Sequence, residues 1–153
     1  MSLALFDRCK ITRISSATTT GTSTVTSAVI DMEGFSSVAF MAALGTVTNG
    51  TVPTLKVKQN TANSTSSPTP TEVTTPSAEE CTVTDVAGET ANGDMIVTLH
   101  RHNPANGRYL FVELHRDTQA CVVQGIWAIQ YDGDDLPVTQ PSSVLKNVVL
   151  TPG

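Results

Sequence analysis

Three groups of residues have side chains of the types that do chemistry in proteins: the histidines His100 and His102, the pair His115 and Asp117, and the acidic run DGDD at 132–135. His115 with Asp117 could form half of an acid–base relay, but no GxSxG or other nucleophile motif accompanies them, which favours an exposed strand end. The run 132–135 offers oxygen ligands for a cation but lacks the spacing and terminal glutamate of a calcium loop. It is predicted to be a solvated turn, with a weak calcium site as the alternative.

The histidine pair has the HxH spacing with which a strand can present two imidazoles to one metal ion, as in cupin barrels. The cupin pattern also requires a glycine and an acidic residue at set distances from the histidines. Here Gly93 is displaced by one position, and Asn106 or Gly107 stands where the acid should be. We therefore interpret His100 and His102 as polar residues beside a turn, with a cupin-like metalloprotein as the weaker alternative.

The remaining reactive residues form no recognisable site. The cysteines Cys9, Cys81 and Cys121 are odd in number and contain no CxxC pair, so they are interpreted as reduced, packed side chains rather than as a disulfide framework or a metal site. Glycine-rich phosphate loops and basic–aromatic patches are absent from the sequence. The sequence thus predicts a structural or binding protein with no catalytic residues, no metal and no cofactor.

The composition and net charge indicate which kinds of partner the protein could bind. Only 15% of the residues are charged and 39% are apolar, whereas about a quarter of the residues of ordinary soluble proteins are charged. The net charge of −5 argues against a nucleic-acid partner, because such proteins need clustered Lys and Arg. The length of 153 residues predicts one domain.

Neither a membrane anchor nor a signal peptide is predicted. The weakly polar run 35–45 is about half of the roughly 20 residues that a membrane-spanning helix needs. The first ten residues, MSLALFDRCK, contain one acidic and two basic residues and no long apolar region. We therefore expect the chain to be made and kept in a cytoplasm, at least until assembly or lysis, and to have no membrane partner.

The pattern of apolar residues predicts strands rather than helices. Runs of five to ten apolar or alternating residues are bounded by Gly, Asn, Asp and Pro, and no long stretch has helical periodicity. In IDMEGFSSVAFMAALG (30–45), residues 31–34 are predicted to form a turn and the next residues a strand that ends at Gly45. Val38, Phe40, Ala42 and Leu44 would fill the core. The opposite face of this strand would be open to a neighbouring sheet or subunit, and it consists of Ser37, Ala39, Met41 and Ala43.

About eight strands with this turn spacing predict an all-β fold, an antiparallel β-sandwich or β-barrel with extended N- and C-terminal arms. The predicted parts are an N-terminal arm (1–20), a β-domain (21–136) with a long polar loop (60–78), and a C-terminal tail (137–153). Residues 3–14 within the first part are interpreted as an arm or an edge strand. The tail is apolar but rich in proline, so we expect it to bury itself on its own domain or on a neighbour.

Four segments together resemble the head decoration, or cement, proteins of tailed bacteriophages. They are IDMEGFSSVAFMAALG, the Asn49-Gly50 turn followed by LKVKQ, the strands RYLFVELHR and CVVQGIWAIQY, and DGDDLPVTQ. The resemblance covers most of residues 25–140. It implies a β-rich protein, commonly a homotrimer, that binds the major capsid protein on the outside of an expanded capsid and resists the pressure of packaged DNA. It also implies location on the virion surface after assembly in the cytoplasm of a host bacterium.

The contact residues for such a role are expected at the two ends of the chain. The N-terminal residues combine apolar side chains with a charge and are candidates for capsid or subunit contacts: Leu3, Leu5, Phe6 and Arg8. The tail residues are candidates for packing between subunits: Val144, Leu145, Val148 and Leu150. The alternative virion function is a head–tail joining, tail or receptor-binding protein that would use the loop 60–78 to touch a partner or a host glycan.

Overall fold

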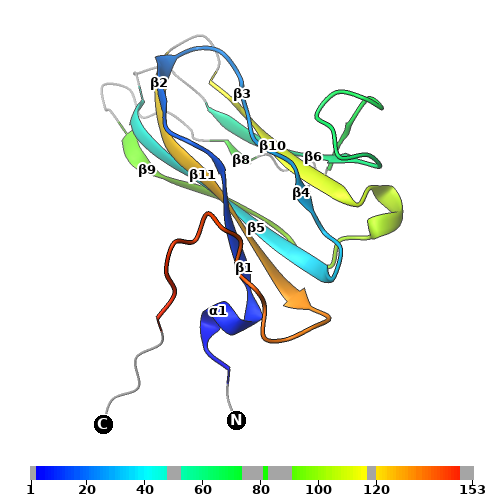
Figure 1. Cartoon of the computed structure of the whole chain (residues 1–153). Coiled ribbons are helices and arrows are strands. Elements are labelled where there is room, and N and C mark those ends of the chain that lie inside the picture. Colours follow the sequence, from blue (N-terminus) through cyan, green and yellow to red (C-terminus); the bar gives the residue numbers. More distant parts are fainter. Residues whose placement is uncertain (1–2, 48–52, 74–80, 83–90, 117–119, 149–153) are drawn as a thin grey trace.

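A computed structural model describes residues 3–47, 53–73, 81–82, 91–116 and 120–148, and the regular secondary structure within them is almost entirely β-strand (Figure 1). The helical elements of these residues are one turn of α-helix, α1 (Leu5–Arg8), and one 3-10 turn, η1 (Pro104–Asn106). No helix in these ranges is long and apolar enough to cross a membrane. The low helix content predicted from the sequence is therefore confirmed.

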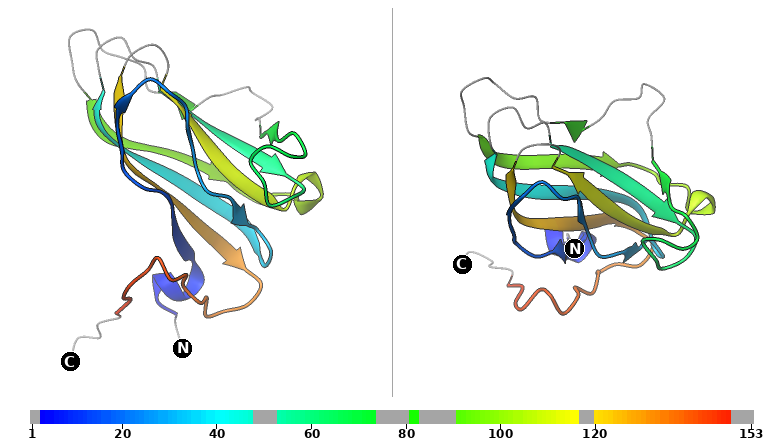
Figure 2. Two further views of the ribbon diagram at one scale, coloured as in Figure 1. Left: turned by 45° about the horizontal axis from the view of Figure 1, so that its top comes forward. Right: turned by 90° about the horizontal axis from the view of Figure 1, so that it is seen from above.

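The strands form two antiparallel sheets that pack face to face (Figure 2). Sheet A contains β1 (Lys10–Ser15), β2 (Thr18–Gly21), β11 (Cys121–Gly133), β5 (Phe35–Val47) and β9 (Ala91–Leu99). Sheet B contains β3 (Val25–Thr26), β4 (Ile30–Asp31), β10 (Tyr109–His115), β6 (Thr54–Asn60), β7 (Thr71–Glu72) and β8 (Cys81–Thr82). Among the described residues no ladder joins the two sheets, so the sandwich is correct and the alternative of a barrel is wrong.

The strand order is that of a jelly roll. Three of the strand positions are occupied by pairs of short strands that share one neighbour: β1 and β2 on β11, β3 and β4 on β10, and β7 and β8 on β6. Counted this way, the described residues form four positions in each sheet, which agrees with the prediction of about eight strands. In chain order, sheet A reads first, eighth, third, sixth and sheet B reads second, seventh, fourth, fifth, the arrangement of a two-sheet jelly roll.

The core lies between the sheets, where the long strand β5 contributes its predicted inner face. Its side chains at alternate positions are buried, as expected: Val38, Phe40, Ala42 and Leu44. Opposite them, sheet B buries Leu110, Val112 and Leu114 of β10 with Leu55 and Val57 of β6. Each fully buried side chain of this size contributes about 1.5–3 kcal/mol, so the alternation of these strands accounts for the two-layer fold.

Two turns at the ends of β5 differ in how well the sequence predicted them. The turn before β5 is confirmed, because Gly34 has a φ of 80°, which glycine adopts without strain, and the Asp31 carboxylate accepts a hydrogen bond from the N–H of Glu33 at 3.0 Å. The predicted turn at Gly45 is wrong, because β5 continues to Val47. A Cβ on Gly45 would lie 2.9 Å from Cγ1 of Val122, so this glycine allows the close approach of β11.

The first twenty residues, predicted as an arm, contribute two strands to sheet A. β1 pairs with β11 from Lys10 to Ser15, which matches the edge-strand alternative for residues 3–14, and β2 pairs with Cys121 and Val123 of β11. The physical reason is that β11 would otherwise present a row of unpaired backbone groups along that side. The β-structure therefore begins before residue 21.

The long polar loop has an ordered first half. Asn60, which is buried, donates hydrogen bonds from its side chain to the carbonyls of Ser64 (2.8 Å) and Pro68 (2.9 Å) and accepts one from the N–H of Ala62 (3.2 Å). The short strand β7 then returns the chain to β6. The rest of the predicted loop, residues 74–78, and the Asn49-Gly50 turn lie outside the described residues.

Candidate functional site

Ser37, His100 and Asp132, which lie far apart in the sequence, come together at one end of sheet A. Ser37 donates a hydrogen bond from Oγ to Oδ2 of Asp132 at 3.1 Å and accepts one from the N–H of Arg101 at 3.1 Å. His100 Nδ1 lies 3.3 Å from the same hydroxyl and 3.4 Å from the hydroxyl of Tyr131, against which its ring is stacked. The group thus contains the residue types of a hydrolase triad.

Its geometry is not that of a triad. In a triad the imidazole lies between the serine and the carboxylate and accepts the serine's proton. Here the serine lies in the middle, donates to Asp132 directly, and has no exposed surface from which it could attack a substrate. The arrangement joins the ends of β5, β9 and β11, which is a structural task.

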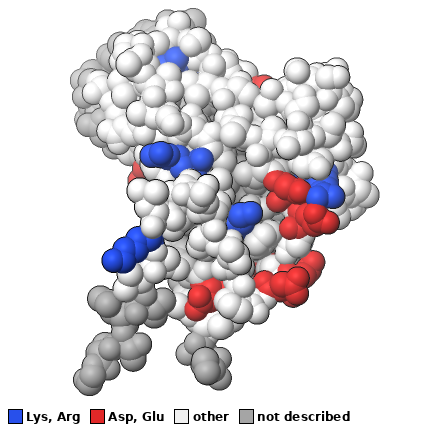
Figure 3. Space-filling view, viewed as in Figure 1, with Lys and Arg blue, Asp and Glu red and all other residues white. Residues whose placement is uncertain are grey.

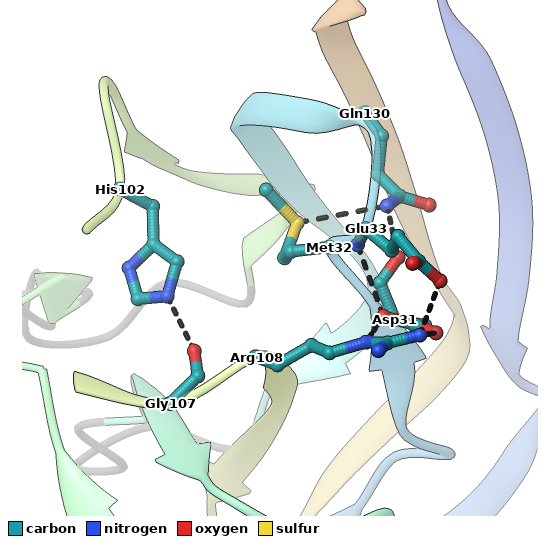
Figure 4. Close-up of polar contacts among 7 residues, drawn as sticks. All are labelled: Asp31, Met32, Glu33, His102, Gly107, Arg108 and Gln130. Carbon is teal, nitrogen blue, oxygen red and sulfur yellow. Dashed lines mark hydrogen bonds and ion pairs between the residues drawn. The ribbon is translucent and has the colours of Figure 1, made fainter. Parts of the chain in front are cut away.

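The two histidines of the HxH pair do not converge. His102 is buried and its Nε2 donates to the carbonyl of Gly107 at 2.6 Å, while its N–H donates to the carbonyl of Ser36 at 2.7 Å (Figure 4). His100 instead contacts Ser37 and Tyr131. A residue of positive φ, Arg101 (55°), separates them and turns the chain. Both side chains therefore make separate structural contacts instead of forming one metal site.

Arg108 forms an ion-pair cluster that the sequence analysis missed (Figure 4). Its Nε and Nη2 each lie 2.7 Å from an oxygen of Asp31, and Nη2 also pairs with Glu33. The hydrogen bonds from Arg108 lower the pKa of Asp31, although partial burial opposes this shift, and they raise the pKa of Arg108. Gln130 of β11, which is buried, donates to the carbonyl of Asp31 at 2.7 Å. The cluster therefore ties β4, β10 and β11 together.

A hollow of about 400 Å³ adjoins this cluster between the turn 33–34, His102 and Asp134. Its cationic group, Arg108, is already paired with two carboxylates, and the ring of His102 is bonded to a carbonyl. Arg108 offsets only one of the three nearby carboxylates, which are Asp31, Glu33 and Asp134, so the hollow keeps a net negative charge.

The acidic run 132–135 diverges instead of surrounding one point. Asp132, with a φ of 54°, bonds Ser37, whereas Asp134 lines the hollow beside Arg108 and Asp135 lines a second hollow on the other side of the turn 33–34. Within the described ranges no group of three or more His, Cys, Asp or Glu side chains could hold a metal ion. The predicted turn starts later than expected, because β11 still includes Asp132 and Gly133 and the chain bends at Asp134 and Asp135.

The outer face of sheet B carries paired charged side chains, together with one fully buried aromatic side chain, Phe111. Lys58 lies 3.6 Å from Glu72 and 3.9 Å from Glu113, and His115 Nε2 lies 3.1 Å from Glu113. Cross-strand pairs of opposite charge suit a sheet surface that faces water. His115 belongs to this network, while its predicted partner Asp117 lies outside the described residues.

The outer face of sheet A has the opposite character. The register places Trp127 of β11 beside Met41 of β5, which in turn lies beside Ile96 of β9, and a second row contains Ile11, Ile129 and Ala39. Ile96 has 60% of its surface exposed and the other five are partly exposed. An antiparallel sheet with one solvated face normally alternates apolar and polar residues. We call this set the outer apolar face: Ile11, Ala39, Met41, Ile96, Trp127 and Ile129.

Trp127 lies across the outer apolar face. A Cβ built on Gly125 would be only 2.8 Å from Cη2 of the indole, so the ring extends over that glycine. A tryptophan ring presents a large rigid area, and such residues are concentrated where proteins bind one another. The sequence analysis predicted that one face of β5 would be open to a neighbour. In the structure this face continues over β1, β9 and β11. Ser37, which was expected on this face, is covered by its contacts with Asp132 and His100.

The candidate contact residues near the N-terminus lie around α1. Leu5 and Phe6 have 69% and 38% of their surfaces exposed, and Arg8 is also exposed. Leu3 and Arg8 line a hollow of about 380 Å³ together with Leu136, which is itself half exposed. We call this the α1 end of the sandwich; it combines apolar and basic side chains with no partner in the described chain that covers them.

The side chain of Gln140 holds the start of the C-terminal tail against α1 and β1, and the tail passes beside these elements in Figure 1. The Nε2 of Gln140 donates to the carbonyls of Phe6 (2.8 Å) and Cys9 (2.5 Å), and its Oε1 accepts from the N–H of Ile11 (3.0 Å). Beyond this point the chain no longer packs on the sandwich: Leu145 is 96% exposed and Val148 is 57% exposed. Val144 is partly exposed, and Leu150 lies outside the described residues. The expected burial of the tail on its own domain is therefore not seen for residues 144–148.

Comparisons with known proteins add little. No protein-family model matches the sequence, and no curated protein matches it. Among solved structures the chain is similar to the VP2 subviral particle of infectious bursal disease virus, with 16% identity and a TM-score of 0.26 over 94% of this chain and 44% of that chain. The Gx strain of the same virus gives 17% identity and a TM-score of 0.25 over 94% and 43%. The chain thus spans less than half of these proteins, and similarities this low carry no argument about function.

Proposed function

We propose that this protein is a structural component of a bacteriophage particle, a decoration protein that binds the exterior of the capsid and stabilises it against the pressure of the packaged DNA. The observation that carries the proposal is a contrast between side-chain types: Ser37, His100 and Asp132 are bonded to one another and His102 is bonded to a backbone carbonyl, whereas apolar side chains are left exposed at the α1 end and on the outer apolar face. These surfaces suit binding and provide no reactive centre.

The kind of partner comes from the resemblance of residues 25–140 to head decoration proteins. That resemblance implies copies of the same chain, as a homotrimer, and the major capsid protein. The jelly-roll order is compatible with it, since jelly rolls occur in viral capsid proteins, although lectins and cupins share the architecture and a fold alone does not define a function. The mostly uncharged face in Figure 3 is in keeping with close protein contacts rather than with nucleic-acid binding.

We assign the capsid contact to the α1 end. Leu5 and Phe6 are exposed there, Arg8 supplies a positive charge, and Leu136 extends the apolar area. Apolar side chains surrounded by polar ones are typical of the centre of a protein interface. Contacts of this kind bind most strongly when the anchor side chains enter a pocket of the partner.

The experiment is binding of the purified protein to expanded capsids that lack it, measured by co-sedimentation and by the temperature at which the capsids rupture. Wild type should bind at saturable stoichiometry and raise the rupture temperature. Leu5→Glu with Phe6→Glu should weaken binding at least tenfold, because each change places a charge in an apolar contact. Ala105→Glu, at an exposed position on η1, is the matched control and should bind normally. Failure of the wild-type protein to bind would refute the proposal.

A second candidate is a head–tail joining, tail or receptor-binding protein, and the loop held by Asn60 is the observation that favours it. Three hydrogen bonds give residues 61–68 a fixed shape, as a recognition loop needs. Immunogold labelling of particles separates the two functions, because a decoration protein is found over the whole head and the alternative only at the tail vertex or on the tail.

A further inference from the structure

Besides the α1 end, the described residues contain two apolar surfaces of different shape that no part of them covers. One is the outer apolar face, which is broad and centred on Trp127. The other is the tail beyond Gln140, where Leu145 and Val148 are exposed. A monomer that leaves both in water loses the free energy of burying them, about 25 cal/mol for each Å². Both surfaces are apolar, so each could be buried by contact with the other.

The position and length of the tail fit it to reach across such a face. Gln140 fixes its start beside β1, at the edge of sheet A. The eight residues 141–148 can extend over at most about 28 Å. The four strand positions of sheet A, with neighbours about 4.8 Å apart, are roughly 14 Å wide from first to last. An extended tail is therefore long enough to cross the outer apolar face from edge to edge.

The tail does not do so on its own sheet. The N–H of Val144 donates to the carbonyl of Pro141 at 2.9 Å, and after this turn the chain runs away from the sandwich (Figure 1). Leu145 of the tail is almost completely exposed, so no described part of the same chain covers it. The charges on the face also favour one orientation of the tail: Lys146 is the one charged residue of 141–148, and the face carries an exposed carboxylate, Asp94, on β9 and an exposed cation, Arg13, beside Trp127.

We propose that the tail of one copy binds the outer apolar face of a second copy. Leu145 and Val148 pack against the row of Trp127, Met41 and Ile96, and Lys146 lies toward Asp94. Because the donor and acceptor surfaces differ, the contact is heterologous and closes into a ring if the rotation between copies allows it. This inference rests on the proposed function in so far as it names the self-partner of a decoration protein, but it concerns assembly of the free protein in solution.

The test uses purified protein without capsids, so its failure is distinguishable from failure to bind capsids. Trp127 is the sole tryptophan of the chain, and its emission therefore reports directly on this face. Wild type at tens of micromolar should sediment as an oligomer with blue-shifted emission, and dilution should shift the emission to the red. Deletion of residues 141–153 should give a monomer with red-shifted emission. Ile96→Glu should also give a monomer, and Ala105→Glu should behave as wild type.

Mixing the two monomeric variants is the decisive step. The tail-deleted chain keeps an intact face and the Ile96→Glu chain keeps an intact tail, so together they should form a one-to-one complex and restore the blue-shifted emission. Absence of this complex overturns the inference. A tail-deleted chain that remains oligomeric would show face-to-face packing instead. A wild-type protein that is monomeric at these concentrations would also overturn the inference. This holds both for blue-shifted emission, with the face covered by the tail of the same chain, and for red-shifted emission, with the face open to water.

Discussion

Arg116→Met should strongly destabilise this protein, because the buried guanidinium of Arg116 joins three segments at one end of the sandwich. The residue is only 2% exposed. Its Nε donates to the carbonyl of Ser23 at 2.7 Å and its Nη1 donates to the carbonyls of Thr19 (2.8 Å) and Cys121 (2.9 Å). Its Nη2 donates to the hydroxyl of Ser23 at 2.9 Å. These contacts connect β2 and the chain after it to the end of β10 and the start of β11.

The magnitude follows from the three carbonyls that would lose a charged donor. Leaving each without its partner costs about 1–3 kcal/mol, and the lower end applies where water can enter. Methionine refills much of the volume, and the cost of dehydrating the guanidinium is removed. We therefore expect a loss of about 3 kcal/mol in the free energy of unfolding. With a urea dependence of about 2 kcal/mol per molar, the midpoint should fall by about 1.5 M.

The assay is urea unfolding followed by far-ultraviolet circular dichroism at one fixed protein concentration, since self-association also shifts the midpoint. Arg13→Met is the control: this arginine is exposed on β1, and its loss should change stability by less than about 0.5 kcal/mol. A Cβ on Gly21 would lie 2.9 Å from Nη2 of Arg116, so Gly21→Ala should cost less in the Arg116→Met background than in wild type. An Arg116→Met protein as stable as the Arg13→Met control, with no coupling to Gly21, would refute the reasoning.

Two further predictions concern titration. Arg108 lowers the pKa of folded Asp31, so the pair stabilises the protein above the ordinary carboxyl pKa of about 4, and this stabilisation is lost as the pH falls through the lower folded value. Arg108→Met should flatten this acid-side loss in urea midpoints measured from pH 6 to 2, and an unchanged slope would contradict the assignment. Burial raises the pKa of the thiols of Cys9, Cys81 and Cys121. A thiol reagent at pH 8 should therefore react slowly with the folded chain, first at the half-buried Cys81, and rapid labelling of Cys121 would be inconsistent with its burial.

The strands could be predicted from the sequence because the alternation of apolar and polar residues that marks a strand lies within a few neighbouring positions. Alternation along β5 identified Val38, Phe40 and Leu44 as core residues, and all three are buried. The turn ending at Gly34 was recognisable from its composition. Gly45 misled the prediction because glycine serves two purposes, turns and close packing, and only the position of Val122 on a distant strand distinguishes them.

The polar clusters could not be predicted because they depend on pairing between strands. Asp31 and Arg108 are 77 positions apart, and they meet only because β4 lies beside β10. Similarly, nothing near His100 in the sequence indicates Ser37, which reaches it because β5 pairs with β9. The spacing of residues along the sequence was enough to judge the HxH pair and the acidic run. It could not reveal contacts between residues that only strand pairing brings together.

The two outer faces of the sandwich differ in polarity, so sheet A is better suited than sheet B to bind another copy. Sheet B carries paired, partly exposed charges such as Lys58 and Glu113 on its outer face, and covering them would require removing their remaining water. Sheet A turns Trp127 and Ile96 outward, and covering these gains free energy at little electrostatic cost. Because the α1 end lies at another part of the molecule, a subunit could bind a neighbour through sheet A and a capsid through α1 at the same time (Figure 2). In the proposed assembly, contacts between copies and contacts with the capsid would thus use separate surfaces.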